Sequence, residues 1–142
     1  MSRVLIVANE TVGADELLAE IRRLEDEKTS TYLVVVPAKP LHEGHGAVWT
    51  QEGAQEAAQT RLDATLAILH AEGLDATGSI GDWSPVNAIR DALIDFHADL
   101  IVISTHPEAR SRWLRKGVVE KAREFGPPVI HIVSNVPAGA GA

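Results

Sequence analysis

The chain has 142 residues, which suits one domain with its own hydrophobic core and leaves little room for a second. It contains no cysteine, so disulfide bonds, thiolate catalysis and cysteine-ligated metal sites are excluded. A formal net charge of −7 argues against general binding to nucleic acids or to anionic membranes.

The first part of the chain holds two apolar runs separated by a helical pattern. Val4–Ala8 and Tyr32–Ala38 are apolar almost without interruption and rich in valine, which favours strands over helices. Between them, apolar residues recur at helical spacing from Leu17 to Leu24, with charged residues on the other face. Because neither run alternates with polar residues, we expect both strands to be buried on both faces, as in a parallel sheet covered by helices.

A loop-like segment, 39–55, follows the second strand and contains the sequence His42-Glu43-Gly44-His45. Two histidines at that spacing are possible zinc or nickel ligands, but no third ligand is set by the sequence, so we predict no metal site. Apolar residues at helical spacing then run from Ala58 to Leu69, and Gly73 provides a stop signal.

A weaker strand is predicted over Ala76–Ile80, where glycine and serine dilute the apolar pattern and favour an edge position. Ser84 is a helix N-cap followed by a first-turn proline, and the apolar stripe of this third helix extends to Phe96.

The last part repeats the alternation once more. Leu100–Ile103 and Val129–Val133 are predicted strands, and the helix between them carries Leu114, Val118 and Ala122 on its apolar face. The segment 126–128, Gly-Pro-Pro, ends that helix. We expect one domain over residues 1–135 and a flexible tail over 136–142.

Strands that alternate with helices predict an α/β fold, in which a doubly wound, five-stranded parallel sheet is covered by helices on both faces. In such sheets, ligands bind at the carboxyl ends of the strands where the strand order reverses. The first strand ends in Ala8-Asn9, and the fourth ends in Ile103-Ser104-Thr105-His106. These are the first candidate site residues.

A basic segment follows the fourth strand. Between Ser104 and Gly126 the chain carries six basic and three acidic residues, so this segment is +3 while the remainder is −10. Arg110, Arg112 and Arg115 cluster at its start, where a phosphate or another anion would be attracted. The alternative interpretation is that these arginines are solvated charges on a helix face.

The layout of the fourth strand, the basic loop and the segment 114–121 resembles the universal stress protein family, as do Gly81-Asp82 and the closing run 126–133. The resemblance covers nearly the whole chain, from Val4 to Val133. It implies the strand order 3-2-1-4-5 and a nucleotide pocket, with ATP or AMP as possible ligands.

In ATP-binding members of that family, a glycine-rich motif after the fourth strand lets backbone N–H groups approach the phosphates. The matching positions here are Ser104, Pro107, Gly117 and Val118, of which only one is glycine. Pro107 has no N–H, and Val118 lacks the hydroxyl that the family motif places there.

Two further pocket positions follow from the same resemblance. Asn9 stands where many members carry aspartate, and Val36 matches the position that usually contacts adenine. The predicted binding residues are therefore Ala8, Asn9, Val36, Ile103, Ser104, His106, Pro107, Arg110, Arg112, Arg115, Gly117 and Val118.

Catalysis is not predicted. Neighbouring residues on a strand point to opposite faces, so Ser104, Thr105 and His106 do not form a hydrolase triad, and the chain lacks a nucleophile-elbow motif. The leading hypothesis is a non-catalytic, cytoplasmic stress-response module that binds a small anionic ligand weakly or not at all. The alternatives are a slow nucleotide hydrolase and a pure dimerisation scaffold.

The last strand predicts the assembly. Val129–Val133 is an edge strand in the expected order, and an apolar edge without charged residues favours pairing with a second copy. A homodimer through this strand is the predicted partner interaction, with neither nucleic acid nor membrane involved.

Overall fold

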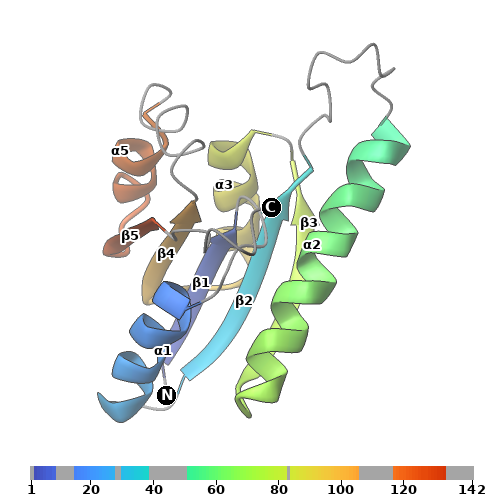
Figure 1. The fold of residues 1–142 in the computed structure, drawn as a ribbon. Helices are drawn as coiled ribbons and strands as arrows, with labels where there is room; N and C mark the ends of the chain where they lie inside the picture. Colours follow the sequence, from blue (N-terminus) through green and yellow to red (C-terminus); the bar gives the residue numbers. More distant parts are fainter. Residues whose placement is uncertain are drawn as a thin grey trace.

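The structure is a computed structural model that describes residues 2–8, 15–27, 30–38, 51–82, 84–105 and 117–133. Its centre is a five-stranded parallel sheet in the order β3-β2-β1-β4-β5 (Figure 1). The strands are β1 (Ser2–Ala8), β2 (Ser30–Pro37), β3 (Asp75–Gly81), β4 (Leu100–Thr105) and β5 (Val129–Val133). The predicted fold class, strand order and five strand positions are confirmed.

The described helices cover both faces of the sheet. They are α1 (Asp15–Glu27), α2 (Gln51–Ala71), α3 (Pro85–Asp95) and α5 (Val118–Arg123). In Figure 1, α1 and α2 lie in front of the sheet, and α3 and α5 lie behind it. Helices on both faces are the reason why the central strands are apolar along their whole length.

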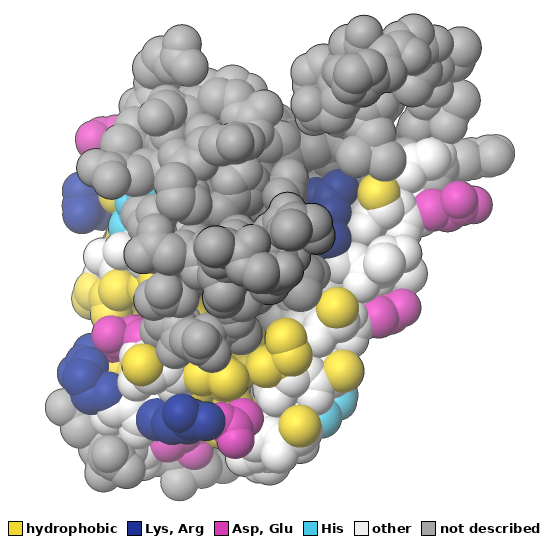
Figure 2. Space-filling view, viewed as in Figure 1, with side chains coloured by type: hydrophobic (Ala, Val, Ile, Leu, Met, Phe, Trp, Pro, Cys, Tyr) yellow, Lys and Arg dark blue, Asp and Glu magenta, His cyan; other side chains and the backbone are white. Residues whose placement is uncertain are grey.

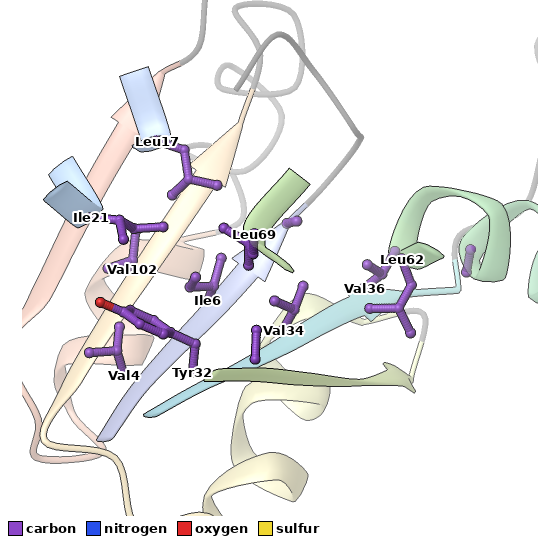
Figure 3. Packing of buried hydrophobic residues seen from close by; sticks show 13 residues of the cluster. Val4, Ile6, Leu17, Ile21, Tyr32, Val34, Val36, Leu62, Leu69 and Val102 are labelled. Carbon is purple, nitrogen blue, oxygen red and sulfur yellow. The ribbon is translucent and has the colours of Figure 1, made fainter. Parts of the chain in front are cut away.

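The hydrophobic core therefore has two layers. On the α1/α2 face, alternate residues of the central strands, such as Ile6, Val34 and Val102, pack against Leu17, Ile21, Leu62 and Leu69 (Figure 3). On the α3/α5 face, the intervening residues Leu5, Val35 and Ile101 pack against Ile89 and Val119. The period of two along each strand divides the side chains between the two layers.

One sequence-based boundary is wrong. Residues 51–55, predicted to be part of a loop, form the first turn and a half of α2. The apolar stripe that marked this helix begins only at Ala58, but glutamine, glutamate and alanine are good helix formers that extend it toward the N-terminus. Residues 39–50, including the predicted loop with its two histidines, lie outside the described residues.

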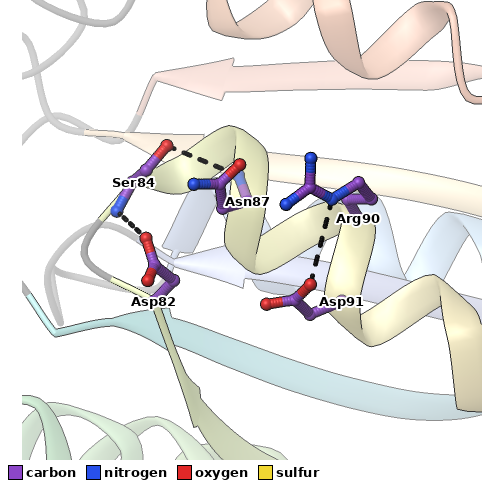
Figure 4. A network of polar contacts seen from close by, with 5 residues as sticks. All are labelled: Asp82, Ser84, Asn87, Arg90 and Asp91. Carbon is purple, nitrogen blue, oxygen red and sulfur yellow. Dashed lines mark hydrogen bonds and ion pairs between the residues drawn. The ribbon is translucent and has the colours of Figure 1, made fainter.

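The start of α3 matches its predicted cap. The hydroxyl of Ser84 accepts a hydrogen bond from the backbone N–H of Asn87 at 3.4 Å, and Asp82 in turn accepts one from the N–H of Ser84 at 2.9 Å (Figure 4). Further along the helix, Arg90 and Asp91 form an exposed ion pair at 3.9 Å. The cap fixes where the helix begins, and its apolar side, with Ala88 and Ile89, packs on the sheet.

Gly81, the last residue of β3, lies in close contact with α3. A Cβ atom at this position would lie 2.6 Å from Cβ of Ala88 and 2.9 Å from Cγ1 of Val35. Only glycine permits this contact between β3 and α3.

Of the helices that the structure describes, none has the length and apolar character needed to cross a membrane.

Candidate functional site

The strand order reverses between β1 and β4, which lie side by side in the middle of the sheet. Their carboxyl ends are in register, with Ala8 beside Ser104 and Val7 beside Ile103. The chain leaves β1 toward α1 on one face and leaves β4 toward α5 on the other, which opens a crevice at this point in doubly wound folds. The structure thus brings together the strand ends that the sequence analysis selected.

The predicted site residues on these strands divide between the two faces of the sheet. Ala8 and Val36 belong to the core layer under α1 and α2, and Ser104 lies on the same face because it follows Val102 by two residues. Ile103 belongs to the opposite layer, under α3 and α5. Three of the four described strand-end positions therefore converge on the α1/α2 face.

Ser104 is the polar residue among these three strand-end positions. Its side chain is only 2% exposed, and no hydrogen bond links its hydroxyl to another residue in the described part of the chain. Buried hydroxyls are nearly always paired with protein, water or ligand. Within the described ranges, the hydroxyl of Ser104 thus has no protein partner at the end of β4 beside Ala8.

The side chain of Val36 is not exposed at the surface. It is fully buried at the end of β2, two strands away from Ser104 on the same face, with β1 between them. Its predicted contact with a planar ligand ring stays a prediction.

The start of α5 provides two of the three described positions of the glycine-rich motif, and Ser104 is the third. Gly117 is the N-cap and has the left-handed conformation, with φ 66° and ψ 28°, which favours glycine. The side chain of Val118 is 1% exposed and packs in the α3/α5 core layer. A ligand would therefore reach Val118 only through its backbone.

The sequence analysis missed one polar contact beside the site. Oγ1 of Thr105, the last residue of β4, lies 2.9 Å from Nε2 of His131 on β5. The two residues lie on the same face of adjacent strands because Thr105 is two residues beyond Ile103, the register partner of His131. The parallel register would have revealed this pair, but it is not visible from residue spacing alone.

The remaining predicted site residues lie outside the described residues: Asn9, His106, Pro107, Arg110, Arg112 and Arg115. The metal-capable pair His42 and His45 lies outside them as well. Within the ranges that the structure covers, no group of three histidine, aspartate or glutamate side chains is placed to hold a metal ion.

Two solved structures share this arrangement of strands and helices. One is a protein of the universal stress protein family from Burkholderia pseudomallei, with a TM-score of 0.58, 17% identity, and coverage of 92% of this chain and 96% of that chain. The other is the universal stress protein from Archaeoglobus fulgidus in complex with dAMP, with a TM-score of 0.57, 22% identity, and coverage of 93% and 97%. The chain has the universal stress protein fold.

The likeness is one of fold and not of sequence. No family model and no curated protein matches the sequence. The universal stress protein fold nevertheless accounts for nearly the whole chain, because both alignments cover more than nine-tenths of it.

Proposed function

We propose that the chain is a non-catalytic, cytoplasmic regulatory module of the universal stress protein type, which binds a small anionic ligand weakly in the crevice at the carboxyl ends of β1 and β4. The observation that carries this proposal is the buried hydroxyl of Ser104, which has no partner among the described residues and lies beside Ala8 where the strand order reverses. A nucleoside monophosphate is the preferred ligand class, because the similar protein from Archaeoglobus fulgidus was solved with dAMP.

Weak binding follows from the positions that differ from the family's phosphate motif. Pro107 offers no N–H, and the buried side chain of Val118 offers no hydroxyl. Ser104 replaces a glycine, so a side-chain hydroxyl stands where backbone would approach a phosphate. Arg110, Arg112 and Arg115 supply positive charge in the same segment of the sequence and are the proposed anion-attracting residues.

A non-catalytic role is supported by the residues at the strand ends. Phosphoryl transfer needs metal-holding carboxylates and a group that positions the nucleophile. Among the described residues, the last positions of β1, β2 and β4 are Ala8, Pro37 and Thr105, none of which is acidic. The slow nucleotide hydrolase is therefore the less favoured function.

Titration of the protein with AMP, followed by amide proton–nitrogen correlation NMR, tests the proposal. We expect shifts at Ala8 and Ser104 that saturate with a Kd on the order of 1 mM, and no release of phosphate from ATP under the same conditions. Ser104→Ala is expected to weaken AMP binding while leaving the fold intact, because it removes one polar contact and one buried polar atom.

Thr65→Ala is the matched control, since it removes another buried hydroxyl whose partner is the Arg61 carbonyl, away from these strand ends. This control should bind AMP as the wild-type protein does. Absence of shifts at about 20 mM AMP, or AMP binding unchanged in Ser104→Ala, would contradict the ligand proposal. Turnover of ATP would favour the hydrolase.

We also propose a homodimer formed by β5. The Pro128 carbonyl accepts the N–H of Ile101 at 2.9 Å, so alternate residues of β5 direct their backbone groups toward β4. The backbone groups of Val129 and His131 therefore face away from the sheet. Pairing with the same strand of a second copy would satisfy these groups and cover the apolar edge.

A further inference from the structure

A cavity lies at the opposite end of the sheet from the candidate site. It has a volume of about 250 Å³ and lies between the C-terminal half of α1 and the turn that joins α2 to β3. In Figure 1 this is the lower end of the molecule, where both helices end. In Figure 2, hydrophobic side chains are exposed there between the two helices, next to basic and acidic side chains.

Part of the wall of this cavity is apolar. Leu18 and Ile21 come from α1 and Leu74 comes from the turn, and all three belong to the core layer or pack against it. Leu18 and Leu74 are only half-buried. The cavity thus leaves apolar surface exposed to solvent, and an apolar ligand would remove that surface from water.

Its charged residues are Arg22, Glu25 and Glu72, and their sum is negative. Arg22 and Glu72 form an ion pair that joins α1 to the turn across the cavity edge. The Arg22 side chain is 67% exposed, so this guanidinium is a rim group that is already paired. Glu25 is the acidic group without a basic partner among the described residues.

Glu25 is held in a fixed orientation. Its Oε2 atom accepts the backbone N–H of Ser30 at 2.9 Å and the hydroxyl of Tyr32 at 2.8 Å. Figure 3 shows the Tyr32 hydroxyl beneath Ile21, on the side of the sheet that α1 covers. No hydrogen bond from a described residue reaches Oε1 of Glu25. In the described part of the chain, one carboxylate oxygen is therefore held in place without a donor of its own.

We propose that this cavity binds a small organic cation, a primary amine with a compact apolar body, whose ammonium group donates to Oε1 of Glu25. A cavity of about 150 Å³ holds benzene, so the larger volume here suits an amine with roughly six to nine carbon atoms. The apolar body would lie against Leu18, Ile21 and Leu74. A negative sum of charges disfavours carboxylates and phosphates, so this site is separate in place and chemistry from the anion crevice.

Phenethylamine is the probe, and phenethyl alcohol is its neutral counterpart. In amide NMR titrations of the wild-type protein, we expect the amine to shift residues of α1 and of the turn at 72–74, with a Kd of about 1 mM or below. The alcohol should bind about tenfold more weakly, because its hydroxyl donates to the same carboxylate but carries no positive charge to attract it. AMP plays no part in this test, so its outcome is independent of the proposed function.

Two variants decide whether Glu25 is the anchor. Glu25→Gln keeps an acceptor for Tyr32 and Ser30 but removes the charge, and we expect it to lose about tenfold in amine affinity. Glu56→Gln, an exposed glutamate of α2 outside this cavity, is the matched control and should bind as the wild type does.

Leu18→Trp places a larger side chain in the cavity and leaves Glu25 itself unchanged, and it should abolish amine binding in a protein with an otherwise unchanged spectrum. Equal affinity for amine and alcohol, undiminished binding by Glu25→Gln, or no specific shift at about 10 mM amine would each overturn the proposal.

Discussion

Thr105 and His131 join the end of β4 to the edge strand β5 through a hydrogen bond of 2.9 Å between Oγ1 and Nε2. Thr105 is fully buried and is the last residue of β4, directly before the segment that carries the predicted anion site. His131 belongs to the strand whose outer backbone groups are proposed to pair with a second copy. This contact therefore lies between the candidate site and the proposed dimer edge.

Thr105→Val tests the contribution of that contact. Valine keeps the branched shape but removes the hydroxyl, so we expect the free energy of unfolding to fall by about 1 kcal/mol in urea denaturation. Thr77→Val makes the same change at an exposed position of β3 and should alter stability by less than about 0.5 kcal/mol. Equal stabilities of the two variants would show that the Thr105 contact contributes nothing.

Val129→Pro tests the proposed dimer. The N–H of Val129 faces away from β4, so proline removes a donor from the outer edge without breaking a hydrogen bond of the ladder within the chain. In sedimentation at micromolar concentration, we expect a wild-type mass of about 30 kDa, twice the 15.2 kDa of one chain. The variant should sediment as a monomer.

Val129→Ala retains the N–H and serves as the control, which should remain dimeric. A monomeric wild-type protein, or a Val129→Pro variant that still dimerises, would place the interface elsewhere or remove it.

The fold was predictable from sequence because strands that are buried on both faces are continuous apolar runs. Val4–Ala8 and Leu100–Ile103 are continuous apolar runs because helices cover both sides of the sheet. Even the edge position of β3 was visible, since Gly78 and Ser79 dilute its pattern and the strand is largely exposed. The start of α2 was missed because residues 51–55 extend the helix beyond its apolar stripe.

The site was predictable only in part, because strand ends can be located from sequence but the register between distant strands cannot. Ala8 and Ser104 are 96 residues apart, and their pairing follows from strand order. The Thr105–His131 contact needs the register of β4 against β5 as well. The cavity near Glu25 could not be predicted from a sequence motif, because its residues come from a helix and a turn that are far apart in the sequence and are brought together by the fold.

Tyr32 makes the stability sensitive to high pH. Burial raises the pKa of its phenol above the ordinary value of 10.0, and the hydrogen bond to Glu25 and its charge raise this pKa further. Above about pH 10 the unfolded chain releases the phenolic proton while the folded chain retains it. The stabilisation is therefore fully present below pH 10 and is lost as the pH rises, by up to about 1.4 kcal/mol per pH unit.

Urea denaturation at about pH 8 and about pH 11 measures this loss. Tyr32→Phe should show a smaller loss between the two pH values than the wild type, although it is less stable at the lower pH because a hydrogen bond is gone. Tyr32 is the only tyrosine in the chain, so its ultraviolet absorbance also reports the pKa directly. Ionisation of the folded protein near pH 10 would contradict the raised pKa.

Substitutions of Gly117 test why this position of the family motif is glycine. Among the described residues, a Cβ atom here would meet only Oε2 of Glu120, at 3.7 Å, and the positive φ of 66° is the feature that favours glycine. We expect Gly117→Ala to lower the free energy of unfolding by roughly 1–2 kcal/mol, the cost of a left-handed conformation for an L-residue. Gly117→Asn should lose less, because asparagine adopts this conformation more readily.

Urea denaturation of the three proteins provides the ranking, and an alanine variant as stable as the wild type would show that the backbone does not require glycine here. In that case close approach to a ligand would be the remaining reason for the glycine, and AMP titration of the same alanine variant would measure it.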